Sequence, residues 1–212
     1  MAATKYTLAD GTQTCGVTTV LDEWKETLFG WKSPEIERAA DIGHQLHGLI
    51  HRANCGTGAK GVKLHPETML EVATGMASWM MWCAARNPRV IGSEIQLISE
   101  KWRIGGTMDA KMWVDGDLWA IDWKPMSLRT SARLQLTAYS EMDREVNPTS
   151  ATDNLMLVGL SRSPKDGPGF VERRWEKNPA DVQIFQSIVD LRNAREGLRA
   201  RHKAALRRDS KG

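Results

Sequence analysis

Two aspartates lie near the middle of the stretch GGTMDAKMWVDGDLWAIDWKP, which covers residues 105–125. Asp109 and Asp122 stand on either side of an Asp-Gly pair at 115–116. An Asp-Gly pair between alternating apolar residues is typical of a two-residue β-hairpin loop. The residues that flank such a loop face each other, and counting back along both strands brings Asp109 opposite Asp122.

A facing pair of carboxylates needs a positive charge or a shared proton, because two negative charges about 5 Å apart repel. Mg²⁺ is commonly held by one or two carboxylates, with water and substrate phosphate completing its shell. Lys124 lies on the same side of the predicted hairpin and would place a positive charge near a phosphate or an attacking water. The residues alone leave two interpretations open, a metal-dependent site or a surface cluster of ordinary salt bridges.

The other face of the predicted hairpin is apolar, which fixes its register, since a slip by one residue would bury both aspartates. We therefore assign Trp123 to the core rather than to a ligand site. The apolar face comprises Met108, Ala110, Met112, Val114, Trp119, Ile121 and Trp123.

The surrounding chain changes from helical apolar spacing to alternation and back to helical spacing. A short β-prone stretch at 16–24 leads into the first helical pattern. This order predicts an α/β (α+β) fold in one domain spanning 1–212, with a central mixed β-sheet flanked by helices. The expected helices are 33–53, 66–86, 131–145 and 179–208, and the expected strands are 89–99, 105–114, 117–124, 154–163 and 169–175.

Length and composition indicate an ordinary globular protein, with 212 residues, 41% of them hydrophobic and 26% charged. No apolar run reaches the roughly 18 to 20 residues of a membrane span, and the N-terminal residues lack a signal peptide's apolar segment. Cys15, Cys55 and Cys83 form no C-x-x-C pair, which argues against a disulfide framework and a thiolate metal site. We expect a cytoplasmic protein in a reducing compartment.

Positive charge is concentrated at the C-terminal end, although the net charge of the chain is only +3. Residues 192–212 carry eight Lys or Arg and two Asp or Glu, which is a local balance of +6. Such an end can contact phosphates, or it can be a solvated helix end, and both interpretations stay open.

Asp109, followed on the next strand by Asp122-x-Lys124, resembles the motif of the PD-(D/E)XK nuclease superfamily. Further matches in chain order narrow the resemblance to its RecB-like exonuclease branch, of the type many phages encode. The resemblance runs, with gaps, from about residue 16 to about 145. The further matches are Gly43 and His47 of GHQLH, Glu94 of GSEIQLIS, the glycines of GGTMD, and Gln135 and Tyr139 of LQLTAYSEM.

The resemblance implies a restriction-endonuclease-like core and a Mg²⁺- or Mn²⁺-dependent deoxyribonuclease. An exonuclease acting on single strands or duplex ends is favoured over a site-specific endonuclease, with products that carry 5′-phosphates. Lys124 would orient the water and stabilise charge on the phosphate, and Gln135 and Tyr139 would lie on the substrate side. The implied metal ligands are Asp109, Asp122, Glu94, His47 and the backbone carbonyl of Trp123. The implied catalytic residues are Asp109, Asp122, Glu94 and Lys124.

The chain departs from the family pattern at Met108, where the motif's name has proline, and at Pro125, where a small hydroxyl residue is common. The four cysteines of iron–sulfur members are absent, so we expect no cluster. Two alternatives stay open. One is a catalytically inactive DNA-binding module, and the other is a nuclease subunit that needs a recombination or replication protein as partner. A phage-encoded protein would act in the cytoplasm of the host cell.

Overall fold

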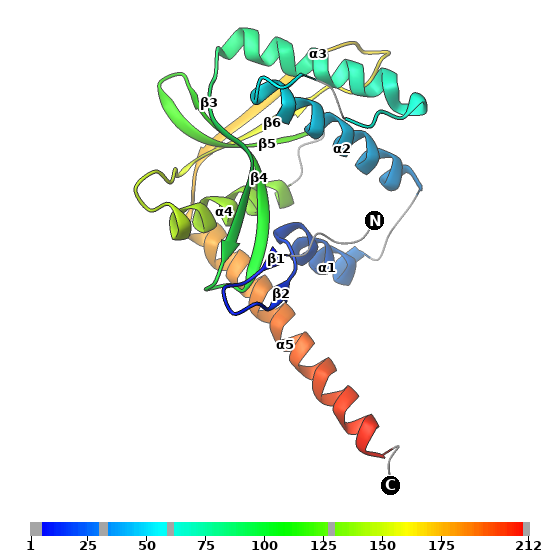
Figure 1. Cartoon of the computed structure of the whole chain (residues 1–212), viewed down its shortest axis with the longest axis vertical. Coiled ribbons are helices and arrows are strands. Elements are labelled where there is room, and N and C mark those ends of the chain that lie inside the picture. Colours follow the sequence, from blue (N-terminus) through cyan, green and yellow to red (C-terminus); the bar gives the residue numbers. More distant parts are fainter. Residues whose placement is uncertain (1–5, 30–33, 59–61, 127–129, 210–212) are drawn as a thin grey trace.

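A five-stranded mixed β-sheet forms the centre of the protein (Figure 1). The computed structural model describes residues 6–29, 34–58, 62–126 and 130–209. Strands β5 and β6 pair in parallel, and the other neighbours are antiparallel. In spatial order the strands are β3 (Arg89–Ser99), β4 (Ile104–Val114), β5 (Asp117–Pro125), β6 (Asn154–Leu160) and β7 (Phe170–Glu176).

Helices flank this sheet, and two clusters of buried apolar side chains fill the space between the layers. One cluster lies under α1, α4 and α5, and the other lies under α2 and α3. None of the helices described is long and apolar enough to span a membrane. The helices are α1 (Val17–Phe29), α2 (Pro34–Asn54), the 3-10 turn η1 (Pro66–Thr68), α3 (Met69–Arg86), α4 (Thr130–Val146) and α5 (Pro179–Asp209), and a separate ribbon pairs β1 (Tyr6–Thr7) with β2 (Gln13–Thr14).

The predicted fold class, a mixed sheet flanked by helices, is confirmed. The prediction of a short β-prone stretch at 16–24 is wrong. Helix α1 already begins at Val17, and Val20 N–H donates to the carbonyl oxygen of Gly16 at 3.1 Å. Val17, Val20 and Leu21 are spaced as one face of a helix, and all three are buried in the core. Tertiary burial of that face outweighs the β preference of valine and threonine.

The hairpin of β4 and β5 has the predicted loop and register. Asp115 and Gly116 both have positive φ, at 55° and 93°, as a type I′ turn requires. The described ladder runs from Val114 opposite Asp117 to Ala110 opposite Ile121. It ends one position before the predicted pair of Asp109 and Asp122.

Both faces of this hairpin are buried, whereas the sequence predicted one buried face and one open face. The apolar residues are buried as expected, but Met108 packs in the cluster under α1 and α4 while Ala110 packs under α2 and α3. On the polar face, Lys111 is buried by α4, where its ammonium lies 2.6 Å from the carboxylate of Asp143. Helices cover both sides of the sheet, so few strand positions reach solvent.

Candidate metal centre

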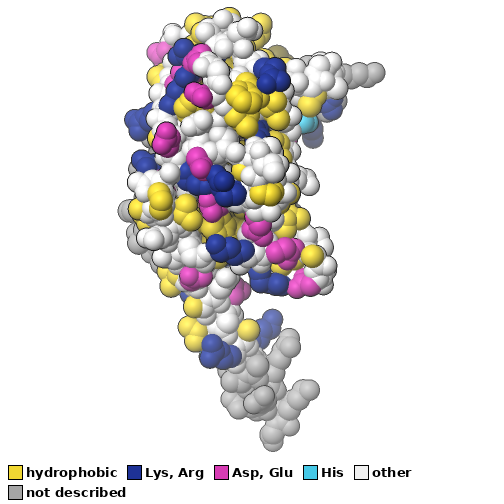
Figure 2. All heavy atoms as spheres, turned by 90° about the vertical axis from the view of Figure 1, so that its left-hand side faces the viewer, with side chains coloured by type: hydrophobic (Ala, Val, Ile, Leu, Met, Phe, Trp, Pro, Cys, Tyr) yellow, Lys and Arg dark blue, Asp and Glu magenta, His cyan; other side chains and the backbone are white. Residues whose placement is uncertain are grey.

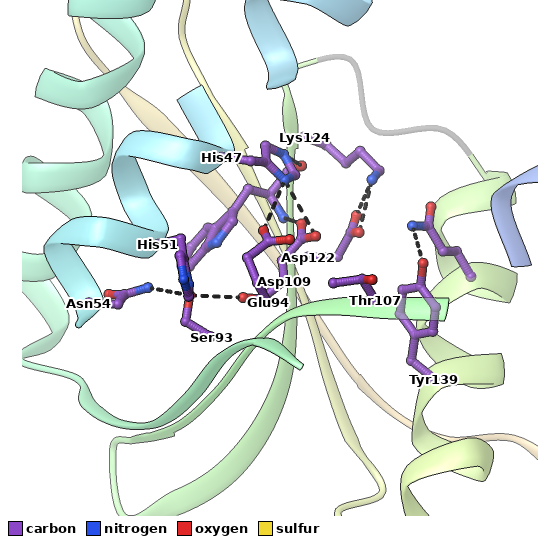
Figure 3. Close-up of polar contacts among 12 residues, drawn as sticks. His47, His51, Asn54, Ser93, Glu94, Thr107, Asp109, Asp122, Lys124 and Tyr139 are labelled. Carbon is purple, nitrogen blue, oxygen red and sulfur yellow. Dashed lines mark hydrogen bonds and ion pairs between the residues drawn. The ribbon is translucent and has the colours of Figure 1, made fainter. Parts of the chain in front are cut away.

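Three predicted ligands from three different elements converge at one point (Figure 3). His47 comes from α2, Glu94 from β3 and Asp109 from β4, and one donor atom of each lies within 4.8 Å of the others. His47 Nδ1 is 3.4 Å from Asp109 Oδ1 and 3.8 Å from Glu94 Oε1. Asp109 is buried, while Glu94 and His47 keep part of their surface exposed.

The main chain of Trp123 supplies a fourth polar group at the same place. Its carbonyl oxygen lies 3.2 Å from His47 Nε2, and its N–H donates to Asp109 Oδ2 at 2.8 Å. The indole ring points into the core, as predicted, and packs edge-on against Trp82 with 5.1 Å between ring centroids. The backbone of Trp123 thus lies in the site while its side chain anchors β5.

Asp122 and Lys124 form an ion pair beside this cluster (Figure 3). Lys124 Nζ donates to Asp122 Oδ1 at 2.9 Å and lies 2.7 Å from Oδ2. Asp122 is completely buried, whereas Lys124 keeps 26% of its side chain exposed. Lys124 therefore contacts both carboxylate oxygens of Asp122, and Oδ2 is held by this ion-pair contact without a further hydrogen bond in the described structure.

The electrostatics of the site follow from burying several charges together. Burial raises the pKa of Asp122 to about 7, with Lys124 opposing the rise and Asp109 adding to it. Burial lowers the pKa of His47, but the carboxylates of Asp109 and Glu94 outweigh it and raise that pKa to about 10. With this pKa His47 carries a positive charge at neutral pH, with Nδ1 facing the two carboxylates and Nε2 facing the Trp123 carbonyl.

Asp109 and Lys124 keep their charges despite their burial. Burial alone would raise the pKa of Asp109, but His47 and Lys124 lower it overall. Burial likewise opposes the charge of Lys124, yet Asp122 and Asp109 raise its pKa above the usual lysine value. The carboxylate of Asp22 on α1 adds to that rise, although the sequence had not pointed to this residue.

These residues fit a divalent cation of the Mg²⁺ or Mn²⁺ kind. Carboxylate and carbonyl oxygens dominate the donor set, which suits hard cations, and His47 adds one nitrogen. The imidazolium of His47 already draws two carboxylates and a carbonyl towards one positive charge, which is what a metal ion would do there. The carboxylate of Asp122, which is buried and paired with Lys124, offers a further ligand.

Tyr139 on α4 adjoins the site (Figure 3), and Gln135 is bonded to it one helical turn away. Gln135 Nε2 donates to the Tyr139 hydroxyl at 3.1 Å, and both side chains are buried. Burial, followed by the charges of Asp109 and Asp122, raises the pKa of Tyr139, which places the phenol near both carboxylates. A Cβ at Gly106 would lie 2.5 Å from the Tyr139 ring, so the GGTMD glycine makes room for it.

The cysteines take no part in the site: Cys15, Cys55 and Cys83 are free thiols at separate places in the described chain. Two residues near the site were not singled out from the sequence: Ser93, whose hydroxyl donates to the carbonyl oxygen of Asp109, and Asn54, whose Nδ2 donates to Ser93 Oγ. A serine and an asparagine in such positions carry no sequence signal of their own.

The chain matches no known protein-family model and no curated protein. Among solved structures it is similar to a candidate exonuclease from Eubacterium rectale, with a TM-score of 0.45, 11% identity, and coverage of 80% of this chain and 70% of that chain. It is also similar to LHK-Exo in complex with dAMP, with a TM-score of 0.40, 17% identity, and coverage of 82% and 91%. Both likenesses are distant, so we derive the function from the side chains of this chain.

Proposed function

We propose that the protein is a metal-dependent deoxyribonuclease of the PD-(D/E)XK type that hydrolyses DNA phosphodiester bonds. The observation that carries this proposal is the convergence of His47, Glu94 and Asp109, with the Trp123 carbonyl 3.2 Å from His47 Nε2 and the buried Asp122–Lys124 pair alongside. Burial of Asp122 beside Asp109 raises the pKa of Asp122 to about 7, and carboxylates perturbed in this way are concentrated at functional sites. The alternative of a surface cluster is also disfavoured by the burial of both aspartates.

The four side chains His47, Glu94, Asp109 and Asp122, with the carbonyl of Trp123, would hold the ion. When bound, Mg²⁺ or Mn²⁺ supplies positive charge to the phosphate oxygens and acidifies water in its shell. Asp109 is fixed for this role by the N–H of Trp123, which binds one carboxylate oxygen and leaves the other directed at His47.

Lys124 is suited to stabilise negative charge rather than to remove a proton. Its raised pKa keeps the ammonium protonated at neutral pH, so it acts as a donor and not as a base. Its exposed fraction of 26% leaves part of the ammonium open to substrate while Asp122 fixes its position. A donor fixed in this way stabilises charge that develops on the scissile phosphate.

Gln135 and Tyr139 act on the site from within the protein. Because both are buried, we assign them to support the position of the carboxylates rather than to grip the exposed part of a DNA strand. Exonucleolytic action on DNA ends and products with 5′-phosphates belong to this proposal through the family resemblance.

The distal half of α5 would contact the DNA backbone. The helix runs out from the body of the protein (Figure 1), and Figure 2 shows Lys and Arg side chains on this narrow stalk. Arg199, Arg201 and Lys203 are exposed there, and the sequence beyond them adds Arg207, Arg208 and Lys211. Phosphates attract such a basic helix at low salt and release it as salt rises.

The test uses end-labelled single-stranded and duplex DNA incubated with the full chain in Mg²⁺, Mn²⁺ or EDTA. We expect metal-dependent shortening from the ends, and Lys124→Met should slow it by roughly 100- to 1,000-fold. Lys165→Met, which removes a lysine from an exposed turn, is the matched control and should cleave normally. DNA that is bound but stays intact with both metals would overturn the nuclease and favour the inactive binding module.

A further inference from the structure

Glu94 stands in a backbone conformation that needs support from its surroundings. Its φ is 52°, in the left-handed region, although it lies inside strand β3. This conformation is unfavourable for an L-residue, because its Cβ approaches the following carbonyl oxygen. The register is unchanged around it, because Ser93 pairs with Ala110 and Ile95 pairs with Met108. Such local distortions persist only where neighbouring groups hold them, and they are concentrated at functional sites.

A two-bond bridge lies directly beside this distortion (Figure 3). Asn54 Nδ2 donates to Ser93 Oγ at 3.2 Å, and Ser93 Oγ donates to the carbonyl oxygen of Asp109 at 3.3 Å. The serine hydroxyl is thus both acceptor and donor, and it joins the end of α2 to both strands of the β3–β4 pair.

The bridge connects the same three elements that carry the metal-binding side chains. Asn54 is the last residue of α2, about two turns after His47. Ser93 directly precedes Glu94, and the third member of the bridge is Asp109 itself. The bridge therefore has one member on each of the three elements that carry His47, Glu94 and Asp109.

We propose that Asn54 and Ser93 are positioning residues that hold His47, Glu94 and Asp109 at the mutual distances a divalent cation requires; this rests on the proposed metal site. Neither side chain reaches the ion. By fixing the end of α2 against β3 and β4, the bridge prevents the helix from sliding along the strands, and it supports the left-handed backbone at Glu94. Groups that orient metal ligands typically change metal affinity by about 10- to 100-fold when they are removed.

A merely structural role predicts a different result, and a second serine on β3 provides the comparison. Ser99 is buried, and its hydroxyl donates to Glu145 at 2.7 Å and accepts from the N–H of Trp102 at 2.9 Å. Ser99→Ala therefore removes two hydrogen bonds from the same strand but leaves the Asn54–Ser93–Asp109 bridge intact. Loss of ordinary hydrogen bonds lowers stability and leaves metal affinity unchanged.

The experiment measures Mn²⁺ binding to the full chain by titration calorimetry, and thermal unfolding in EDTA, for both serine variants. Ser93→Ala should weaken Mn²⁺ binding by about 10- to 100-fold, whereas Ser99→Ala should lower the Tm and bind Mn²⁺ normally. Ser93→Thr keeps the hydroxyl and should restore affinity. Asn54→Ala combined with Ser93→Ala should bind no more weakly than Ser93→Ala, because both changes break one bridge.

The outcomes separate this proposal from the proposed function. Mn²⁺ binding by Ser93→Ala at the wild-type affinity, or an equal loss in Ser99→Ala, would overturn the positioning role and leave the nuclease intact. Mn²⁺ binding that Ser93→Ala weakens, together with no DNA cleavage by the wild-type chain, would support the positioning role and overturn the nuclease. Wild-type chain that fails to bind Mn²⁺ would overturn both.

Discussion

Replacing Lys124 with methionine should destabilise the metal-free protein by an amount that grows as pH rises above about 7. Asp122 is completely buried, and Lys124 is the side-chain partner that the described structure gives its carboxylate. Burial holds the pKa of Asp122 at about 7 even with that ammonium in place. Without it, the folded-state pKa should rise further, towards the roughly 8–9 known for fully buried carboxylates.

The sign of the effect follows from comparing folded and unfolded states. The pKa of an unfolded aspartate is about 3.9, so a folded pKa above it means that the folded protein prefers the protonated carboxyl. Stability is then lost as pH rises from the unfolded to the folded pKa, and it levels off above the latter. The contribution of Asp122 levels off near pH 7 in the wild type, whereas in the variant it continues to fall by about 1.4 kcal/mol per pH unit. The additional loss should reach about 1.5–3 kcal/mol at high pH.

Urea unfolding of both chains in EDTA, from about pH 6 to about pH 9, measures this difference. Lys124 lowers the pKa of His47, but with that pKa at about 10 in the wild type, His47 is protonated in both folded chains over most of this range and adds nearly the same slope to both. Lys165→Met, an exposed lysine, should show a small difference that does not change with pH. Adding Asp122→Asn to Lys124→Met should remove the additional dependence of the unfolding free energy on pH. A destabilisation by Lys124→Met that stays constant over the whole pH range would refute the reasoning.

Three further predictions concern the metal, the buried ion pair and the glycine of GGTMD. The pKa of His47 is raised to about 10, so the imidazole is protonated at neutral pH before it binds a metal. Mn²⁺ binding should therefore release about one proton from His47. Identical calorimetric enthalpies in buffers of different ionisation enthalpy would contradict this. Lys111→Met should cost about 3–5 kcal/mol in urea unfolding, and adding Asp143→Leu should recover most of it; a double variant as unstable as the single would count against the pair. Gly106→Ala should lower the free energy of unfolding by about 1–3 kcal/mol, because the new Cβ would lie 2.5 Å from the Tyr139 ring. Gly169→Ala is the control, since a Cβ there meets nothing within 4 Å. Equal thermal stability of the two variants would show that the ring moves freely.

The sequence by itself determined the elements and the register of the central hairpin. Alternation and helical spacing are repeated over many residues, so they identify strands and helices with good bounds. The Asp-Gly pair at 115–116 specifies a turn whose two positive φ angles few other residues tolerate, and the apolar face then excludes a slipped register. The types and spacing of Asp109, Asp122 and Lys124 indicated the chemistry before any distance was known.

The tertiary structure decided which of these groups meet. Asp109 was predicted to face Asp122, and the described ladder stops one position short of that pair. The side chain of Asp109 lies with His47 and Glu94 and accepts from the N–H of Trp123, while Asp122 pairs with Lys124. Helices that cover both faces bury the polar side of the hairpin, and this burial is what raises the pKa of Asp122. Distances between α2, β3 and β4 depend on packing and on long-range bonds such as the Asn54–Ser93 contact, and no local pattern of residues encodes them.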